Sequence, residues 1–171
     1  HPGSAFAAHP ASMIRAANAF DVFSHACESL TARPFTWREA PGHPSRRPLT
    51  QGANPYSDIA CLESIKLIGN NLILGVHAPM DDHLETLMFA GMLAGIGFGN
   101  VGCHPPHGMN YAVAGLYKDY HLEGWPSDHS MVPHGISVIV NSPAVFRFTG
   151  PACAERHLSA AKAMGADVNG V

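Results

Sequence analysis

The sequence of 171 residues predicts a single, mostly α-helical domain. Apolar residues recur at helical spacing in several segments. No alternating strand pattern in the chain is longer than the one at residues 135–141. The chain is 46% hydrophobic and 13% charged, so it can bury a core and is not intrinsically disordered. We therefore expect one domain at residues 1–171, with a long loop rich in proline and arginine at residues 33–55.

The charge balance excludes one class of partner. Ten basic and 13 acidic side chains give a net charge of −3, so no basic field can hold a nucleic acid. The stretch between Glu85 and Lys118 lacks charged residues, but its glycines, prolines and histidines argue against a membrane span. Residues 1–12 show no signal-peptide pattern. We expect an intracellular chain with no membrane partner.

The four cysteines, Cys27, Cys61, Cys103 and Cys153, are widely spaced and form no Cys-x-x-Cys pair. This spacing excludes a zinc ribbon and a redox dithiol motif, and it disfavours a disulfide scaffold. We expect four reduced, mostly buried thiols. Any metal chemistry would then use histidine, of which the chain has 12, and carboxylate.

The first helix is expected at residues 12–32, where no glycine or proline interrupts the apolar spacing. Ser12 is a suitable N-cap, and Pro34 ends the helix. The loop at residues 33–55 is unusually long for a compact domain, and such loops are often functional.

The second helix is expected to begin at Asn54, with proline in its first turn, and to run to about residue 76. The third begins at Asp81 or Asp82, and we expect the glycines of residues 96–102 to unwind it. Four small residues in this helix would let another backbone approach closely. They are Ala90, Gly91, Ala94 and Gly95.

Three further helices are expected in the second half of the chain. One covers residues 107–121, and another covers residues 133–146, where Pro143 kinks or ends it. Residues 135–141 are rich in β-branched side chains and could equally form a strand. The last helix covers residues 151–164 and is closed by a glycine.

One carboxylate and several histidines form a candidate metal site. Asp21 and His25 are four residues apart on the first helix, so they share one face and could chelate a divalent ion. An ordinary ion pair on a solvated face is the alternative. His104, His107 and His134 follow or flank prolines, which restrict their backbones. Carboxylate and imidazole, without thiolate, suit Fe(II), Zn(II) or Mn(II).

These motifs make the sequence resemble the metal-binding C-terminal domain of the iron-containing alcohol dehydrogenases. The segments FDVFSHACES (20–29), AGIGFGNVGCHPPHGMNYAVAG (94–115) and VPHGISVIVNSPAVF (132–146) carry the resemblance. RPLTQGANPYSD (47–58) and ERHLSAAKAMGAD (155–167) are similar to the hydroxyacid-oxoacid transhydrogenase branch of that family. The resemblance covers nearly the whole chain, with its motifs in the family's order.

The resemblance implies a site. A divalent metal, Fe(II) or Zn(II), would be held by Asp21, His25, His107 and His134, with His104 as the alternative ligand. Many members have a histidine near the nicotinamide where this chain has Tyr111, and the transhydrogenase branch has tyrosine there. Tyr111 is therefore the candidate catalytic residue.

The resemblance also implies an activity. The complete enzyme would be a metal-dependent, NAD-linked oxidoreductase acting on the hydroxyl of a small alcohol or hydroxyacid, for example 4-hydroxybutyrate with 2-oxoglutarate. A Lewis acid stabilises charge on oxygen during hydride transfer. Four arginines of the long loop could bind the substrate carboxylate, or they could be surface charges. They are Arg33, Arg38, Arg46 and Arg47.

The family's nucleotide-binding domain is expected to be missing from this chain. No strand is followed by a Gly-x-Gly-x-x-Gly turn, and GIGFGN (95–100) ends a helix instead. We expect the chain alone to be inactive, with association into homo-oligomers as a further possibility. The alternatives are a truncated non-catalytic module, a generic iron-containing alcohol dehydrogenase and a dehydroquinate synthase-like lyase, which the Asp and three His disfavour. The location would be mitochondrial in a eukaryote and cytoplasmic in a bacterium.

Overall fold

The computed structural model describes residues 12–121 and 128–169. These residues form helices and no strand, so the predicted mostly helical fold is confirmed. The α-helices are α2 (Ser12–Leu30), α3 (Pro55–His77), α4 (Asp81–Val101), α5 (Pro105–Leu116), α6 (His134–Ile139), α7 (Ser142–Thr149) and α8 (Ala154–Ala163). Three 3-10 turns join them: η1 (Phe35–Trp37), η2 (Pro44–Arg46) and η3 (Gly150–Ala152). The expected absence of a signal peptide falls mostly on residues outside these ranges.

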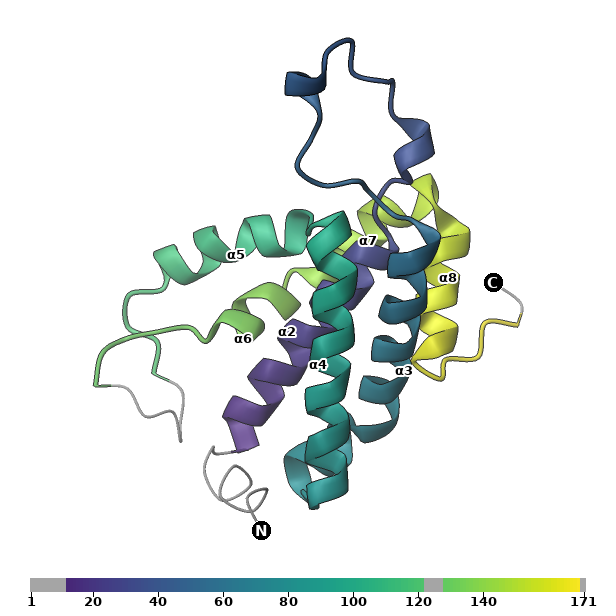
Figure 1. Ribbon diagram of the computed structural model, residues 1–171. Coiled ribbons are helices and arrows are strands. Elements are labelled where there is room, and N and C mark those ends of the chain that lie inside the picture. The colour runs from purple at the N-terminus through teal and green to yellow at the C-terminus, as the bar shows by residue number, and fades with distance from the viewer. Residues whose placement is uncertain (1–11, 122–127, 170–171) are drawn as a thin grey trace.

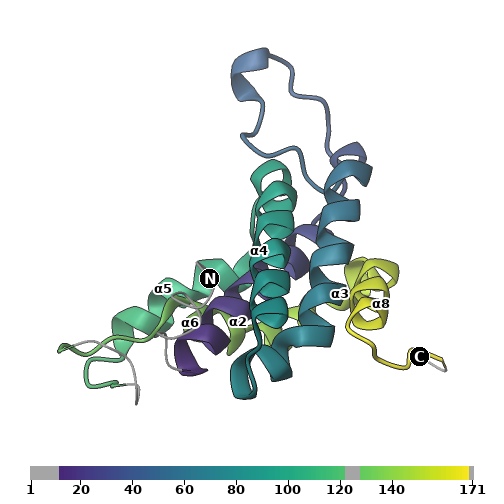
Figure 2. The ribbon, with the colours of Figure 1, turned by 60° about the horizontal axis from the view of Figure 1, so that its bottom comes forward.

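Three long helices form the centre of the domain. Helices α2, α3 and α4 pack against one another, and α8 lies along α3 (Figures 1 and 2). Helices α5 and α6 extend to one side and pack against α2 and each other. The main apolar cluster joins α2, α3, α4 and α8 through small and branched side chains. Its buried members are Ala26, Cys27, Leu30, Cys61, Ile65, Ala94 and Ala160.

Both ends of α3 are fixed by polar contacts. Asn54 is the N-cap, and its side-chain oxygen accepts a hydrogen bond from the N–H of Ser57 at 3.0 Å, as predicted. At the other end, the guanidinium of Arg15 on α2 donates to the carbonyls of Gly75 and Val76 at 3.0 and 3.1 Å. A basic group at a helix C-terminus satisfies carbonyls that the helix leaves unpaired. The start of α2 is thus tied to the end of α3.

Helix α4 does not unwind at its glycines. It continues to Val101 and ends at Gly102, whose φ of 88° only glycine adopts easily, so the expected unwinding over residues 96–102 is wrong. Gly97 serves packing instead, because a Cβ added there would collide with the Cys61 sulfur on α3. Of the four small residues, Ala90 and Ala94 are buried in the bundle, whereas a Cβ on Gly95 would meet open space.

The segment at residues 133–146 forms two helices rather than one. Residues 135–141 are not a strand: α6 covers most of them, and the break falls at Val140 and Asn141. Asn141 donates from its side chain to the Ser137 carbonyl at 2.7 Å. Pro143 lies in the first turn of α7, where its missing N–H costs nothing, so it begins a helix instead of ending one.

The loop at residues 33–55 projects beyond the helices as an open arch (Figures 1 and 2). Its two ends meet at a narrow neck. Phe35 donates its N–H to the Ala53 carbonyl at 3.3 Å, and Ala53 donates to the Arg33 carbonyl at 3.1 Å. Arg38 strengthens the neck by donating to the Thr50 carbonyl at 3.0 Å. The arch therefore has a fixed base and an exposed tip.

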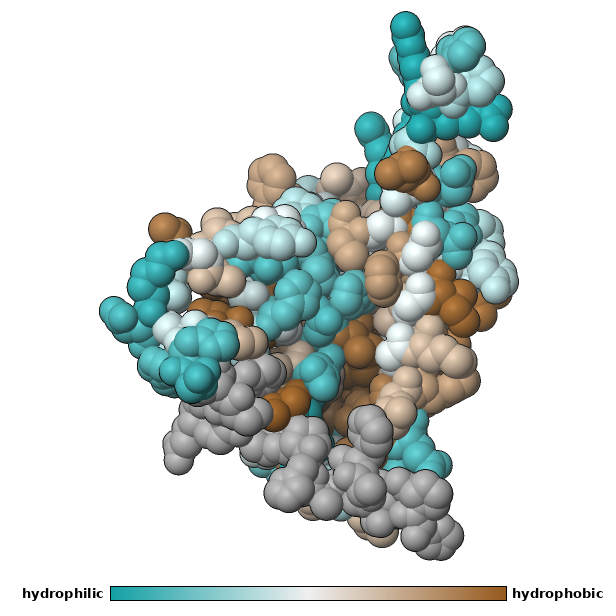
Figure 3. Space-filling view, turned by 60° about the vertical axis from the view of Figure 1, so that its left-hand side comes forward, coloured by the Kyte–Doolittle hydropathy of each residue, from teal (hydrophilic) through white to brown (hydrophobic). Residues whose placement is uncertain are grey.

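Helices α3 and α4 carry more apolar side chains than the core buries. Both have the length and hydropathy of a membrane span, with only 39% and 22% of those windows buried. Core helices of other folds satisfy the same criteria, so the absence of a membrane partner stays a prediction. Figure 3 shows a run of apolar and near-neutral surface beside a hydrophilic central area. The large exposed apolar side chains of α4 are Met88, Phe89, Met92 and Ile96.

Candidate metal centre

The carboxylate of Asp21 on α2 lies among three imidazoles. Its Oδ1 is 3.7 Å from Nδ1 of His25, 3.3 Å from Nε2 of His107 and 3.3 Å from Nε2 of His134. Helix α2 supplies Asp21 and His25 one turn apart, whereas His107 and His134 come from α5 and α6. The structure thus brings together all four side chains that the sequence singles out as ligands.

The spacing of these atoms suits a small divalent ion. Donors about 2.1 Å from a tetrahedral zinc lie about 3.4 Å apart, close to the measured separations from Asp21. The donor atoms of Asp21, His107 and His134 all lie within 4.8 Å of one another. One carboxylate and three neutral imidazoles would leave a divalent ion with a net charge of +1. The residues present therefore fit the metal that the sequence implies.

Glu28 holds His107 in one orientation. Its carboxylate is fully buried, and Oε1 accepts a hydrogen bond from Nδ1 of His107 at 2.7 Å. The other oxygen accepts the backbone N–H of His104 at 2.7 Å. Because Nδ1 donates its proton to Glu28, Nε2 is the nitrogen directed at Asp21, and it can bind a metal once its own proton is displaced. The sequence analysis did not identify Glu28, although it lies seven residues after Asp21, on the same helix face.

Electrostatics in the cluster favour a cation. Burial alone would raise the pKa of Asp21, but the hydrogen bond from His107 and the nearby imidazoles hold this pKa below its ordinary value. Burial alone would lower the pKa of His107, but hydrogen bonds with Asp21, Cys103 and Glu28 raise it to about 11. Burial lowers the pKa of His25. Two carboxylates around His107 thus stabilise a positive charge at this point.

His104 lies apart from the cluster, although its backbone shares Glu28 with His107. Its Nε2 is 3.0 Å from the Thr31 hydroxyl, and its Nδ1 is buried without a hydrogen-bond partner. Burial lowers the pKa of His104, so the ring is held neutral. The ring meets Phe146 edge-on, with centroids 6.1 Å apart. These contacts direct the His104 side chain toward α2 and α7. The His107 ring instead lies tilted against the rings of His25 and His134, with centroids 4.3 and 5.4 Å away.

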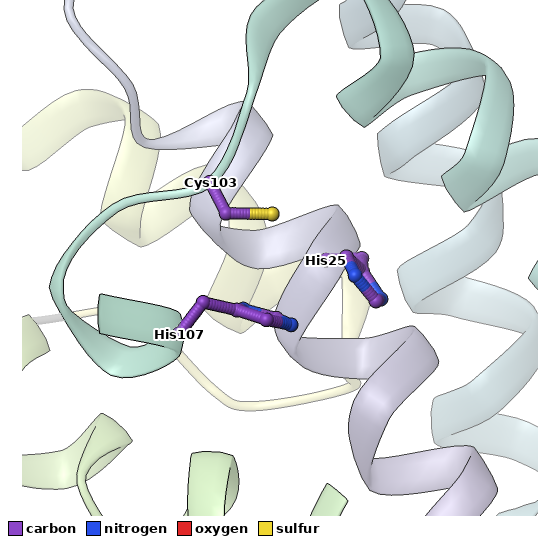
Figure 4. A group of neighbouring side chains, drawn as sticks. All are labelled: His25, Cys103 and His107. Carbon is purple, nitrogen blue, oxygen red and sulfur yellow. The ribbon is translucent and has the colours of Figure 1, made fainter. Parts of the chain in front are cut away.

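Cys103 is a second residue near the centre that sequence reasoning missed. The expectation of mostly buried thiols holds for Cys27 and Cys61, but Cys103 is exposed. It lies in the turn between α4 and α5, and its sulfur forms a second group of potential ligands with His25 and His107 (Figure 4). All three donor atoms lie within 4.8 Å of one another. A thiol therefore lies beside the carboxylate–imidazole set that the sequence predicts.

The remaining candidate residues lie on the surface. Tyr111 is on α5, one turn after His107, with 76% of its surface exposed. The four arginines of the arch are exposed, and the arch carries the outer ones away from α5 and α6 (Figures 1 and 2). None of them is among the side chains gathered around Asp21. They are Arg33, Arg38, Arg46 and Arg47.

Fold and site together define an all-helical domain with a carboxylate–imidazole centre suited to a divalent metal. Residues 49–171 match the model of the C-terminal domain of the Fe-containing alcohol dehydrogenase family. The chain belongs to this family, as the sequence motifs predict.

Two curated relatives of this chain are hydroxyacid-oxoacid transhydrogenases. The mitochondrial hydroxyacid-oxoacid transhydrogenase of Xenopus laevis is 44% identical over 166 residues, which cover 94% of this chain and 36% of the relative. The human protein of the same name is 43% identical over 161 residues, covering 93% of this chain and 34% of the relative. The chain spans about a third of the length of the curated relatives it matches.

Solved structures show the same fold. A 1,3-propanediol oxidoreductase superposes with a TM-score of 0.73 at 26% sequence identity, covering 95% of this chain and 35% of that chain. The alcohol dehydrogenase from Oenococcus oeni also superposes with a TM-score of 0.73, at 24% identity, covering 95% of this chain and 34% of that chain. The second likeness concerns the fold alone.

Proposed function

We propose that this domain is the metal-binding part of an NAD-linked oxidoreductase of the hydroxyacid-oxoacid transhydrogenase type. The single observation that carries the proposal is the Asp21 carboxylate within 3.3 to 3.7 Å of three imidazole nitrogens. The chain is 43–45% identical to transhydrogenases, against 26% and 24% to the two superposed oxidoreductases, and this difference favours the transhydrogenase branch over a generic alcohol dehydrogenase. The substrates would be a small hydroxyacid and oxoacid, such as 4-hydroxybutyrate and 2-oxoglutarate.

Each residue has a proposed role. Asp21, His25, His107 and His134 hold Fe(II) or Zn(II), which supplies Lewis-acid stabilisation of charge on the substrate oxygen. Glu28 keeps Nε2 of His107 directed at the centre. We further propose that Tyr111, exposed one turn beyond His107, lies near the nicotinamide in the complete enzyme.

We also propose that a nucleotide-binding domain completes the active site. The chain covers about a third of its relatives, and the side of the centre formed by His134 is half exposed. Exposed apolar side chains on α4 supply surface for contact with another domain or another copy. NAD would bind between the two domains. The curated relatives are named mitochondrial, which supports the mitochondrial alternative for the location.

The first experiment measures the metal content of the 171-residue chain by mass spectrometry. About one iron or zinc per chain is expected, with loss of the metal in a His107→Ala/His134→Ala variant. His77→Ala, an exposed histidine at the end of α3, is the matched control and should keep the metal. A folded chain that binds no metal, or a double variant that keeps it, contradicts the proposed ligands.

A second experiment tests the enzymatic part of the proposal. The N-terminal portion of the Xenopus laevis relative, absent from the matched region, is mixed with the metal-loaded chain, 4-hydroxybutyrate and NAD. Formation of NADH by the mixture, and by neither part alone, is expected. If the mixture forms NADH equally well with the His107→Ala/His134→Ala variant, this domain does not supply the metal chemistry.

A further inference from the structure

We propose that Cys103 is a thiolate ligand of the metal centre, and that it binds zinc together with His25 and His107. The inference deepens the proposed function, because it rests on the same centre and adds a donor outside the carboxylate–imidazole set. The thiol would lose its proton to solvent as the sulfur–zinc bond forms, so one proton is released for each thiolate bound.

The backbone of Cys103 is fixed from both sides. Before it, Gly102 donates its N–H to the Phe98 carbonyl at 2.6 Å and accepts a hydrogen bond from the Ser29 hydroxyl at 3.2 Å. After it, His104 donates its N–H to Glu28 at 2.7 Å. The turn that carries the thiol is thus anchored to α2, the helix that supplies Asp21 and His25. Cys103 keeps its place beside the centre while its exposed side chain can rotate.

The three donor atoms can reach one ion. Sulfur and nitrogen donors of a tetrahedral zinc lie about 3.6 Å apart, given Zn–S of about 2.3 Å and Zn–N of about 2.1 Å. The sulfur and the imidazole nitrogens of His25 and His107 lie within 4.8 Å of one another, so a rotation of the Cys103 side chain closes the difference. Figure 4 shows the sulfur and both rings directed toward a common space.

Two donor groups overlap at His107. One contains His25 and Cys103, and the other contains Asp21 and His134. His134 is the most exposed of the imidazoles, with 51% of its side chain accessible, and it comes from the six-residue helix α6. Cys103 is therefore placed to add a donor to the centre beside Asp21. A bound thiolate would lower the net charge of the centre from +1 to 0.

The donor chemistry favours zinc. Thiolate is a softer ligand than carboxylate or imidazole, and zinc accepts mixed sulfur and nitrogen sets in structural and catalytic sites. The other thiols cannot supply the sulfur. Cys27 and Cys61 are buried in the core between α2 and α3, and Cys153 donates to the Thr31 carbonyl at 3.4 Å.

X-ray absorption spectroscopy on the zinc-loaded 171-residue chain tests the inference. One sulfur per zinc at about 2.3 Å is expected. The sulfur shell should disappear in Cys103→Ser, an exposed substitution that leaves the helices intact, and remain in the control Cys153→Ser. It should also remain in Asp21→Ala, which breaks the carboxylate–imidazole set but keeps His25, Cys103 and His107.

The outcomes separate the two proposals. Zinc bound to the wild-type chain by nitrogen and oxygen alone overturns the thiolate ligand and leaves the proposed function standing. A sulfur shell that persists in Cys103→Ser also overturns it. A folded wild-type chain, checked by circular dichroism, that binds neither zinc nor iron overturns both proposals.

Discussion

The buried carboxylate of Glu28 on α2 lies 2.7 Å from Nδ1 of His107 on α5, and the two helices meet at the metal centre. Glu28 follows Asp21 by seven residues and His25 by three, so one face of α2 presents two candidate donors and the hydrogen-bond partner of His107. A buried carboxylate is stable only when its oxygens are hydrogen-bonded, and the two acceptor bonds of Glu28 meet this need. The orientation of His107 therefore depends on a residue that touches no metal.

Glu28→Gln should weaken metal binding while the helices stay folded. Glutamine keeps the size of the side chain, but its neutral amide no longer fixes the proton on Nδ1 of His107. Loss of such a partner typically costs about 10–100-fold in metal affinity, which a competition titration with a chelator measures. Glu63→Gln, an exposed substitution on α3 next to Lys66, is the control. Equal affinities in Glu28→Gln and wild type would show that Glu28 does not position the ligand.

Metal affinity should rise with pH. The pKa of His107 without metal is raised to about 11, mainly by hydrogen bonds with Asp21, Cys103 and Glu28 that outweigh the effect of burial. A metal must displace the proton from Nε2, so protons oppose binding below that pKa. Calorimetry in buffers of different ionisation enthalpy should detect at least one proton released per ion at pH 7. Binding without proton release would contradict a protonated His107.

The same histidine links pH to the stability of the metal-free fold. Burial disfavours the charged ring, but the hydrogen-bonded carboxylates overcome this effect and raise the folded pKa above the ordinary value of 6.5. The stability that His107 contributes is therefore complete below pH 6.5 and is lost as pH rises toward 11. Urea titrations at pH 7 and pH 9, compared with His107→Gln, should show that wild type loses more stability. A pH effect of equal size in the variant would refute this assignment.

Gly97→Ala should destabilise the domain. Its Cβ would collide with the Cys61 sulfur at the contact between α3 and α4. Overpacking of this kind costs about 1–3 kcal/mol, which urea unfolding measures. Gly99→Ala in the same helix meets open space and should stabilise the domain by up to about 1 kcal/mol, because alanine favours a helix. Similar effects of the two substitutions would contradict close packing at Gly97.

Arg156→Ala should loosen the contact of α8 with the rest of the bundle. The guanidinium donates to the Leu30 carbonyl at the end of α2 and to the Asp58 carboxylate in the first turn of α3. Hydrogen bonds that involve charged groups contribute about 1.5–3 kcal/mol, so thermal unfolding should shift down by several degrees. Lys162→Ala in the last turn of α8 is the control. A similar small change in both variants would show that the Arg156 contacts are not stabilising.

Local signals predicted most of the fold. Asn54 caps α3 with its side chain, Asp81 and Asp82 are acidic residues in the first turn of α4, and Gly165 follows α8 with a positive φ, so neighbouring residues determine these helix ends. The course of α4 could not be predicted in this way, because Gly97 is required by Cys61, 36 residues earlier in the chain. The same holds for the β-branched side chains of residues 136–139, which are helical because Gly135 allows α6 to lie directly on α2.

The metal centre was predictable in part for the same reason. The spacing of Asp21 and His25 on one helix is a local pattern, and motifs pointed to His107 and His134. Glu28 and Cys103 gave no such signal, because a buried glutamate and an exposed cysteine gain meaning only from the side chains that the fold brings beside them. The spacing of cysteines along the sequence cannot show that the fold brings one thiol close to two histidines.

The arch at residues 33–55 is a suitable place to attach a label or an inserted domain. Its neck is closed by hydrogen bonds between Arg33, Phe35 and Ala53, so chain added at the tip would not pull the helices apart. A Cβ on Gly42 would meet nothing within 4 Å, and its neighbours are exposed. A dye, an affinity tag or an inserted reporter domain could be grafted between Gly42 and His43 and leave the metal centre undisturbed.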